Sequence, residues 1–253
     1  MSSLSASLGT LSVVSVLSRP LVIAIDGPSG SGKSSTAKGV AARLQLDFLD
    51  TGAMYRAATW LVLRARADID QIDAVADLVR RSELVISLDP HAATVAVDGH
   101  DVTAAIREPA VSAAVSKVAG NLQVRQHLIG IQRTLIAGSR RGIVAEGRDI
   151  TTVVAPDADL RLLLVADPST RVARRHAELG DGVRSDDVTD QVLRRDRDDA
   201  GVTQFEQPAP GVRMVDSTTL SLDEVIALIC GMVAQHPAAD QPVGVNQRMQ
   251  VRP

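Results

Sequence analysis

The sequence predicts an α/β protein built on a doubly wound parallel sheet of five strands, with a small antiparallel insert and a helical lid. Three observations lead to this prediction. Short apolar runs alternate with segments of helical periodicity along most of the chain. The first apolar run passes through a glycine-rich loop directly into a helical pattern. Between residues 84 and 103 the pattern changes to short β-like runs.

The expected strands are short and mostly apolar, as buried parallel strands are. They cover residues 21–26, 47–49, 143–146, 160–166 and 213–216. Helical spacing of apolar residues falls between and after them. The expected helices cover residues 34–46, 53–66, 110–119, 122–137, 169–179, 186–200 and 221–234. In the insert, residues 84–88, 94–97 and 100–103 are β-like, and the Asp98-Gly99 turn favours antiparallel pairing.

The composition is that of an ordinary globular protein, with 45% hydrophobic and 23% charged residues. A net charge of −3 and an aromatic content of 2% give no support for a nucleic-acid polymer or a membrane as partner. The single cysteine, Cys230, excludes an internal disulfide framework and fits the cytoplasm. We expect a domain over residues 20–236, a disordered extension at 1–19 and a disordered tail at 237–253.

The loop after the first strand has the phosphate-binding pattern G-x-x-x-x-G-K-[ST]. Its backbone N–H groups and the following helix N-terminus are suited to phosphate oxygens. Lys33 is expected to reach the β- and γ-phosphates of ATP, and the Ser34 hydroxyl to ligate Mg²⁺. The expected ATP-binding residues of the loop are Gly27, Pro28, Ser29, Gly30, Ser31, Gly32, Lys33, Ser34 and Ser35. A dinucleotide is disfavoured, because Ser35 stands where the G-x-G-x-x-G pattern needs its third glycine.

Two further motifs follow expected strands at their carboxyl ends, where open α/β sheets bind ligands. Residues 50–56 (DTGAMYR) follow the second strand, and Gly147-Arg148-Asp149 follows the third. Glu146, at the end of that strand, is placed to orient Mg²⁺ through a water molecule. The plain alternative for Arg148 and Asp149 is an ion pair between them at the surface.

The combination of IDGPSGSGKSS, LDTGAMYR and VAEGRDI resembles the bacterial cytidylate kinase family. The downstream segments VVAPDADLRLLL and VDSTTLS are similar to the same family, so that the resemblance covers residues 21–230 in order. It implies a Mg²⁺-dependent transfer of the γ-phosphoryl group of ATP to CMP or dCMP by a monomeric enzyme. It also implies that the insert, at about residues 67–120, belongs to the acceptor-binding region.

The resemblance assigns roles to residues that match its motifs. Arg56 and Arg148 match arginines that hold the acceptor phosphate, a task suited to a planar guanidinium. Four residues match positions around the cytosine: Thr51, Ser116, Arg125 and Asp149. Two residues match positions at the ribose: Arg195 and Asp199. For the helical Ser116 and Arg125, the alternative is that they face solvent.

A lid is expected over about residues 169–200. Arg171, Arg174 and Arg175 have the spacing i, i+3, i+4, which places them on one helical face. Like charges at this spacing repel one another unless an anion is bound, and the triphosphate of ATP is such an anion. We therefore expect Arg174 to bind ATP. The residues expected to act in catalysis are Lys33, Arg148, Arg171 and Arg175.

The sequence departs from the family pattern at two places. Val202 stands where the family usually has an arginine, and residues 203–208 are altered. Thr151 stands where the family usually has a glycine. Because valine cannot bind phosphate, we expect weakened CMP binding, by roughly 10- to 150-fold for one lost charged hydrogen bond. The substitution Val202→Arg is expected to lower the KM for CMP, and an unchanged KM in steady-state kinetics would contradict this.

Two other functions stay open at the level of sequence. One is a P-loop kinase for another small molecule. The rates of phosphorylation of a panel of acceptors distinguish it from a cytidylate kinase. The other is a nucleotide-binding regulatory protein with a degenerate acceptor site, motivated by Val202. The intact phosphate loop, Arg56 and Arg148 argue against the second.

Overall fold

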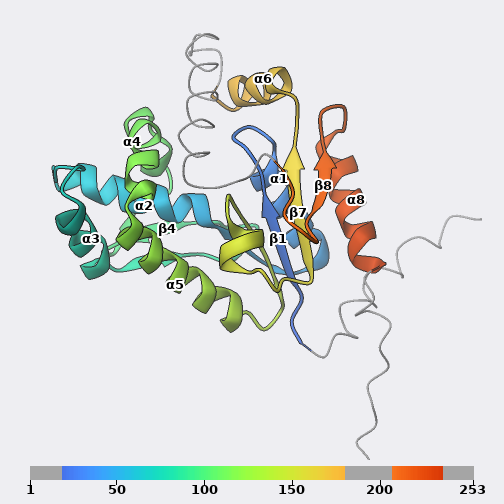
Figure 1. The fold of residues 1–253 in the computed structure, drawn as a ribbon, viewed down its shortest axis with the longest axis horizontal. Helices are drawn as coiled ribbons and strands as arrows, with labels where there is room; N and C mark the ends of the chain where they lie inside the picture. The colour runs from blue at the N-terminus through green and yellow to red at the C-terminus, as the bar shows by residue number, and fades with distance from the viewer. Residues whose placement is uncertain (1–18, 180–206, 236–253) are drawn as a thin grey trace, which may run out of the picture.

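The central sheet has five strands in the order β2-β6-β1-β7-β8 (Figure 1). The computed structural model describes residues 19–179 and 207–235. All neighbouring strands are parallel, which confirms the predicted sheet. The strands are β1 (Val22–Asp26), β2 (Asp47–Asp50), β6 (Ile143–Gly147), β7 (Leu160–Val165) and β8 (Arg213–Asp216).

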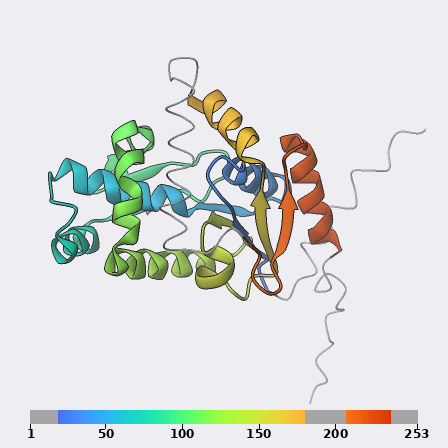
Figure 2. The same cartoon turned by 45° about the horizontal axis from the view of Figure 1, so that its top comes forward.

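Helices cover both faces of this sheet, as the doubly wound prediction requires. Side chains of a strand alternate between faces, so Ile23 and Ile25 pack against α1 and α8. Ala24 belongs to the second core, on the opposite face, with residues of α2, α3 and α5. The bounds are α1 (Lys33–Leu44), α2 (Thr51–Arg64), α3 (Ile72–Arg81), α5 (Leu122–Gly138) and α8 (Leu222–Ala234). In Figures 1 and 2 the helices α2, α3 and α5 lie toward one end of the molecule and α8 lies at the other.

The insert is a three-stranded antiparallel sheet, as predicted. Its strands are β3 (Leu84–Ile86), β4 (Val95–Val97) and β5 (His100–Asp101). Asp98 and Gly99, with φ angles of 48° and 74°, join β4 to β5 in the left-handed backbone conformation that such a tight turn needs. The helical turn η2 (Ala105–Arg107) and the helix α4 (Pro109–Gly120) follow, and α4 packs against α2 and α5. The insert packs against α2 through a small core of its own.

The structure contains two elements that the sequence pattern does not predict. One is α3, and the other is a π-helical turn, η3 (Ile150–Val154), directly after β6. Helix α6 (Pro168–Leu179) confirms the helix expected at 169–179. The expected helix at 186–200, the tail from residue 237 and residues 1–18 of the extension lie outside the described residues. Within the described ranges, no helix has the length and apolar character that crossing a membrane requires.

Candidate active site

The phosphate loop connects β1 to α1 at the carboxyl end of the sheet. Gly30 and Gly32 have φ angles of 74° and 84°, a backbone conformation that disfavours any other residue. At Gly30 a Cβ atom would also lie 2.6 Å from the carbonyl oxygen of Arg171. The glycines therefore let the loop curve tightly while α6 packs against its back.

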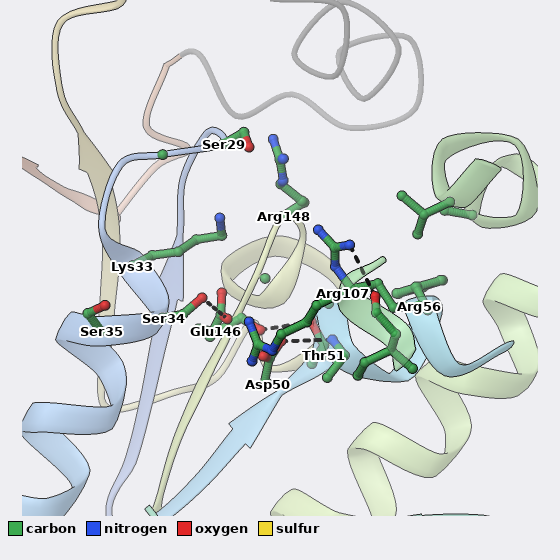
Figure 3. A pocket seen from close by; sticks show the side chains of 18 of the residues that line it. Ser29, Lys33, Ser34, Ser35, Asp50, Thr51, Arg56, Arg107, Glu146 and Arg148 are labelled. Atoms are coloured by element: carbon green, nitrogen blue, oxygen red, sulfur yellow. Dashed lines mark hydrogen bonds between the residues drawn. The ribbon is translucent and has the colours of Figure 1, made fainter. Parts of the chain in front are cut away.

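Lys33 and Ser34 occupy the first turn of α1, directly after the loop (Figure 3). The Lys33 ammonium donates a hydrogen bond to the carbonyl oxygen of Pro28 at 3.2 Å, so its side chain folds back over the loop. The Ser34 hydroxyl donates to the Glu146 carboxylate at 2.5 Å. The loop thus presents a cation and a hydroxyl at the place where the sequence pattern predicts phosphate and Mg²⁺.

A cavity of about 550 Å³ extends from the phosphate loop to the insert. This volume lies within the usual range for small-molecule sites. Most of the residues predicted from sequence line it. They are Ser29, Gly30, Gly32, Lys33, Ser34, Ser35, Thr51, Arg56, Ser116, Arg125, Glu146, Arg148, Asp149 and Arg175.

Two carboxylates, Glu146 and Asp50, lie together in the cavity wall. Burial is the main cause that raises the pKa of Glu146 to about 7, and the negative charge of Asp50 raises it further. Lys33 and the hydrogen bond from Ser34 act in the opposite direction. Hydroxyl and carboxylate oxygens are the donors that Mg²⁺ prefers, and two neighbouring carboxylates favour a bound cation. The residues present therefore fit the predicted metal.

Four arginines line the cavity close to one another: Arg56, Arg107, Arg148 and Arg175. Burial lowers the pKa of Arg56, and the charges of the other three lower it further. The Arg56 guanidinium donates to the Ser112 hydroxyl at 2.8 Å and to the carbonyl oxygen of Ile106 at 3.4 Å, which fixes its orientation. A cluster of converging guanidinium groups is suited to a bound phosphate dianion.

Asp149 forms its ion pair with Arg125 of α5 at 2.5 Å, and not with its neighbour Arg148. The two side chains are only 7% and 15% exposed, which rules out the alternative of a surface pair between residues 148 and 149. Burial raises the pKa of Asp149, while the charge and the hydrogen bond of Arg125 lower it. Beside this pair, burial and the charge of Asp149 raise the pKa of the Tyr55 phenol, which stays neutral.

The three arginines of α6 contact the phosphate loop or line the cavity beside it, as their common helical face predicts. Arg171 is buried and donates to the carbonyl oxygen of Ser29 at 3.1 Å. Arg174 donates to the carbonyl oxygens of Ser31 at 3.3 Å and Ser217 at 2.6 Å. Arg175 reaches the cavity. Arg171 and Arg174 thus hold the loop from behind, and their contact with ATP stays a prediction.

Some residues predicted from the sequence lie outside the cavity lining, and two residues of the lining were not predicted. Within the described part of the chain, five predicted residues lie outside the cavity lining: Gly27, Pro28, Ser31, Arg171 and Arg174. Arg195, Asp199 and Val202 lie outside the described residues. Arg107, which lines the cavity from the insert, was missed because a single arginine in a polar turn carries no motif. Asp50 was not predicted as a carboxylate of the site, although it is the first residue of the motif that contains Arg56.

The fold and the site together define a P-loop kinase: a parallel sheet, a phosphate loop at its carboxyl end and an arginine-lined cavity beside that loop. A profile of the cytidylate kinase family matches residues 23–235. The chain belongs to the cytidylate kinase family.

Curated relatives agree with this assignment. The cytidylate kinase of Cutibacterium acnes is 53% identical over 217 residues, which cover 85% of this chain and 96% of that protein. The cytidylate kinase of Streptomyces avermitilis is 43% identical over 220 residues, 87% of this chain and 95% of that protein. A shikimate kinase structure from Acinetobacter baumannii covers 89% of this chain and 98% of its own at 12% identity and a TM-score of 0.43, too remote to bear on the substrate.

Proposed function

We propose that this chain transfers the γ-phosphoryl group of ATP to CMP or dCMP, giving ADP and CDP or dCDP. Family membership supports the reaction class and the acceptor. The observation that carries the proposal is that the buried Arg125–Asp149 pair lines the same cavity as Lys33. A phosphate-donor site and a polar base site thus share one cavity, as a nucleoside monophosphate kinase needs.

The base is read by the Arg125–Asp149 pair in this proposal. The Asp149 carboxylate accepts a hydrogen bond from the amino group of cytosine, and Arg125 donates to the ring N3 and O2. A uracil has a carbonyl in place of the amino group and is repelled by the carboxylate. Thr51 and Ser116 complete the base site, since both line the cavity beside the pair. The Thr51 hydroxyl already donates to the carbonyl oxygen of Glu146 at 2.8 Å, so it is left to accept a bond from the base.

Phosphoryl transfer needs positioning and charge stabilisation more than covalent chemistry from the protein. The acceptor phosphate binds between Arg56, Arg107 and Arg148, while Lys33 and the loop amides hold the donor phosphates. Arg148 and Arg175, which line the same cavity, neutralise the charge that spreads over the transferred group. Ser34 and Glu146 would hold Mg²⁺, Glu146 through a water molecule. When bound, Mg²⁺ neutralises phosphate charge and aligns the donor phosphates.

The remaining features of the proposal concern the surroundings of the site. The insert over about 67–120 belongs to the acceptor side, which Arg107 and Ser116 in the cavity wall support. The lid over about 169–200 closes on ATP and excludes water. The partners are ATP and the monophosphate, and the enzyme acts as a monomer in the cytoplasm.

A coupled assay of ADP production with CMP, dCMP, UMP, AMP and shikimate tests the proposal. CMP or dCMP is expected to give the highest kcat/KM. A preference for UMP would contradict the role of Asp149, and a preference for shikimate would favour another small-molecule kinase. Binding of ATP without phosphorylation of any acceptor would favour a degenerate regulatory protein.

The substitution Arg56→Ala tests the acceptor-phosphate site. We expect the KM for CMP to rise by roughly 10- to 150-fold, because a charged hydrogen bond of about 1.5–3 kcal/mol is lost. The KM for ATP should stay within about twofold. Arg64→Ala is the matched control, because it removes the same charge from an exposed position of the same helix. Equal changes in both KM values, or an effect as large in the control, would contradict the assignment.

A further inference from the structure

The carboxylate of Asp26 is the acceptor for three hydrogen bonds from one short segment of chain. The backbone N–H groups of Ile150 and Thr151 donate to it at 2.9 Å and 2.8 Å. The Thr151 hydroxyl donates to it at 2.6 Å. Asp26 and Thr151 are each only 3% exposed, so this contact lies inside the protein and away from solvent competition.

This buried contact joins the two halves of the site. Asp26 ends β1 and directly precedes Gly27, the first residue of the phosphate loop. Ile150 and Thr151 directly follow Arg148 and Asp149. A displacement of the Asp26 carboxylate therefore moves the backbone that carries the acceptor-side arginine and the base-reading acid. The geometry also explains η3, since the first N–H groups of this turn are bonded to Asp26.

The end of β6, which precedes Arg148 and Asp149, is also held. The Thr51 hydroxyl donates to the carbonyl oxygen of Glu146 at 2.8 Å, and a Cβ atom at Gly147 would lie only 2.4 Å from that hydroxyl oxygen. Beyond the turn, Arg161 donates to the carbonyl oxygen of Thr151 at 3.3 Å. The backbone of residues 146–151 is thus anchored on both sides of Arg148 and Asp149.

Thr151 is the residue that stands where the cytidylate kinase family usually has a glycine. It is one of the two departures of the sequence from the family pattern. In the structure the Thr151 side chain bonds to Asp26, and Thr151 is not one of the residues that line the cavity in the described part of the chain. A glycine at 151 would keep the two N–H bonds and lose the hydroxyl bond. The threonine therefore adds one hydrogen bond between this segment and Asp26.

We propose that Asp26 and Thr151 are positioning residues that hold the 148–149 segment at the correct place beside the phosphate loop, with the Thr151 hydroxyl as the bond that this chain adds. The inference rests on the proposed function, because the effect is expected on the acceptor. Neither residue touches the substrates; both act through Arg148 and Asp149. Binding and phosphorylation of CMP therefore depend on the hydrogen bond between Thr151 and Asp26 more than binding of ATP does.

The test compares Thr151→Val, Thr151→Gly and Thr151→Ser by steady-state kinetics for both substrates. Valine keeps the shape and removes the hydroxyl, and glycine also removes the side chain. Both are expected to lower kcat/KM for CMP by at least about tenfold, the effect of one hydrogen bond to a charged group. The KM for ATP should change by less than about twofold. Serine restores the hydroxyl and should restore the kinetics.

Thr152→Val is the matched control, because Thr152 is the exposed neighbour of Thr151. Thermal unfolding of each variant, with and without CMP, reports folding independently of turnover. Wild-type kinetics in Thr151→Val would overturn the inference. Equal changes in both KM values that serine does not rescue would also overturn it, since they would indicate only a structural role. A wild-type chain that fails to phosphorylate CMP contradicts the proposed function instead.

Discussion

Replacing Lys33 by methionine is expected to lower kcat by about 10³-fold, at the lower end of the effect of a transition-state cation in phosphoryl transfer. The Lys33 ammonium lies over the phosphate loop, 3.2 Å from the carbonyl oxygen of Pro28, and points into the cavity beside Arg148 (Figure 3). Methionine has a similar length and no charge, so the loop backbone keeps its shape. Arginine is not a conservative replacement here, because its planar fork differs from a compact ammonium.

The control for this prediction is Arg43→Met on the same helix. Arg43 is exposed in the last turn of α1, so the substitution removes one positive charge far from the loop. The measurement is ADP production at saturating CMP, together with ATP binding by calorimetry. A Lys33→Met variant with kcat within about threefold of wild type would remove Lys33 from the catalytic residues.

The main architecture could be predicted because local patterns agree with the tertiary structure. The apolar run at 21–26 is buried on both faces in β1, and the loop after it carries a motif whose glycines have the left-handed backbone that the pattern implies. The Asp98-Gly99 turn is likewise a local feature. Such signals depend on neighbours in sequence, and the structure confirms them.

The two missed elements lacked a local signal for different reasons. Helix α3 begins without a side-chain cap, and its first residue, Ile72, is 55% exposed, so its start has no clear sequence mark. The turn η3 has the sequence ITTVV, whose β-branched residues favour a strand. Its helical turn depends on bonds to Asp26, which is distant in sequence. Tertiary contacts there override local propensity.

The site was predictable as a set of residues and not as a set of contacts. The spacing of Arg171, Arg174 and Arg175 predicted a common face, and that face does meet the phosphate loop. Their bonds to loop carbonyl oxygens could not be predicted, because the partners lie more than a hundred residues earlier. The partner of Asp149 was also missed: Arg125 was named for the base, and its ion pair with Asp149 depends on how α5 packs on the sheet.

That ion pair leads to the second large prediction, a change of acceptor in Asp149→Asn. An asparagine keeps one oxygen that can accept from cytosine and adds an N–H₂ group that can donate to the carbonyl of uracil. It also leaves the Arg125 guanidinium, only 15% exposed, without its charged partner at 2.5 Å. We expect kcat/KM for CMP to fall by about 10²-fold or more. The cytosine amino group loses its charged acceptor, and a buried polar group is left without its matched partner.

The kcat/KM for UMP is expected to stay constant or rise, so the ratio of CMP to UMP should fall by at least about 10²-fold. The ratio separates base recognition from damage to the fold, because a general loss of active enzyme lowers both values equally. Asp157→Asn is the matched control, since it makes the same change at an exposed position beyond the same loop. Thermal unfolding accounts for the cost of leaving Arg125 unpaired in the interior. A variant with an unchanged CMP-to-UMP ratio would mean that Asp149 only anchors Arg125 and that another group reads the base.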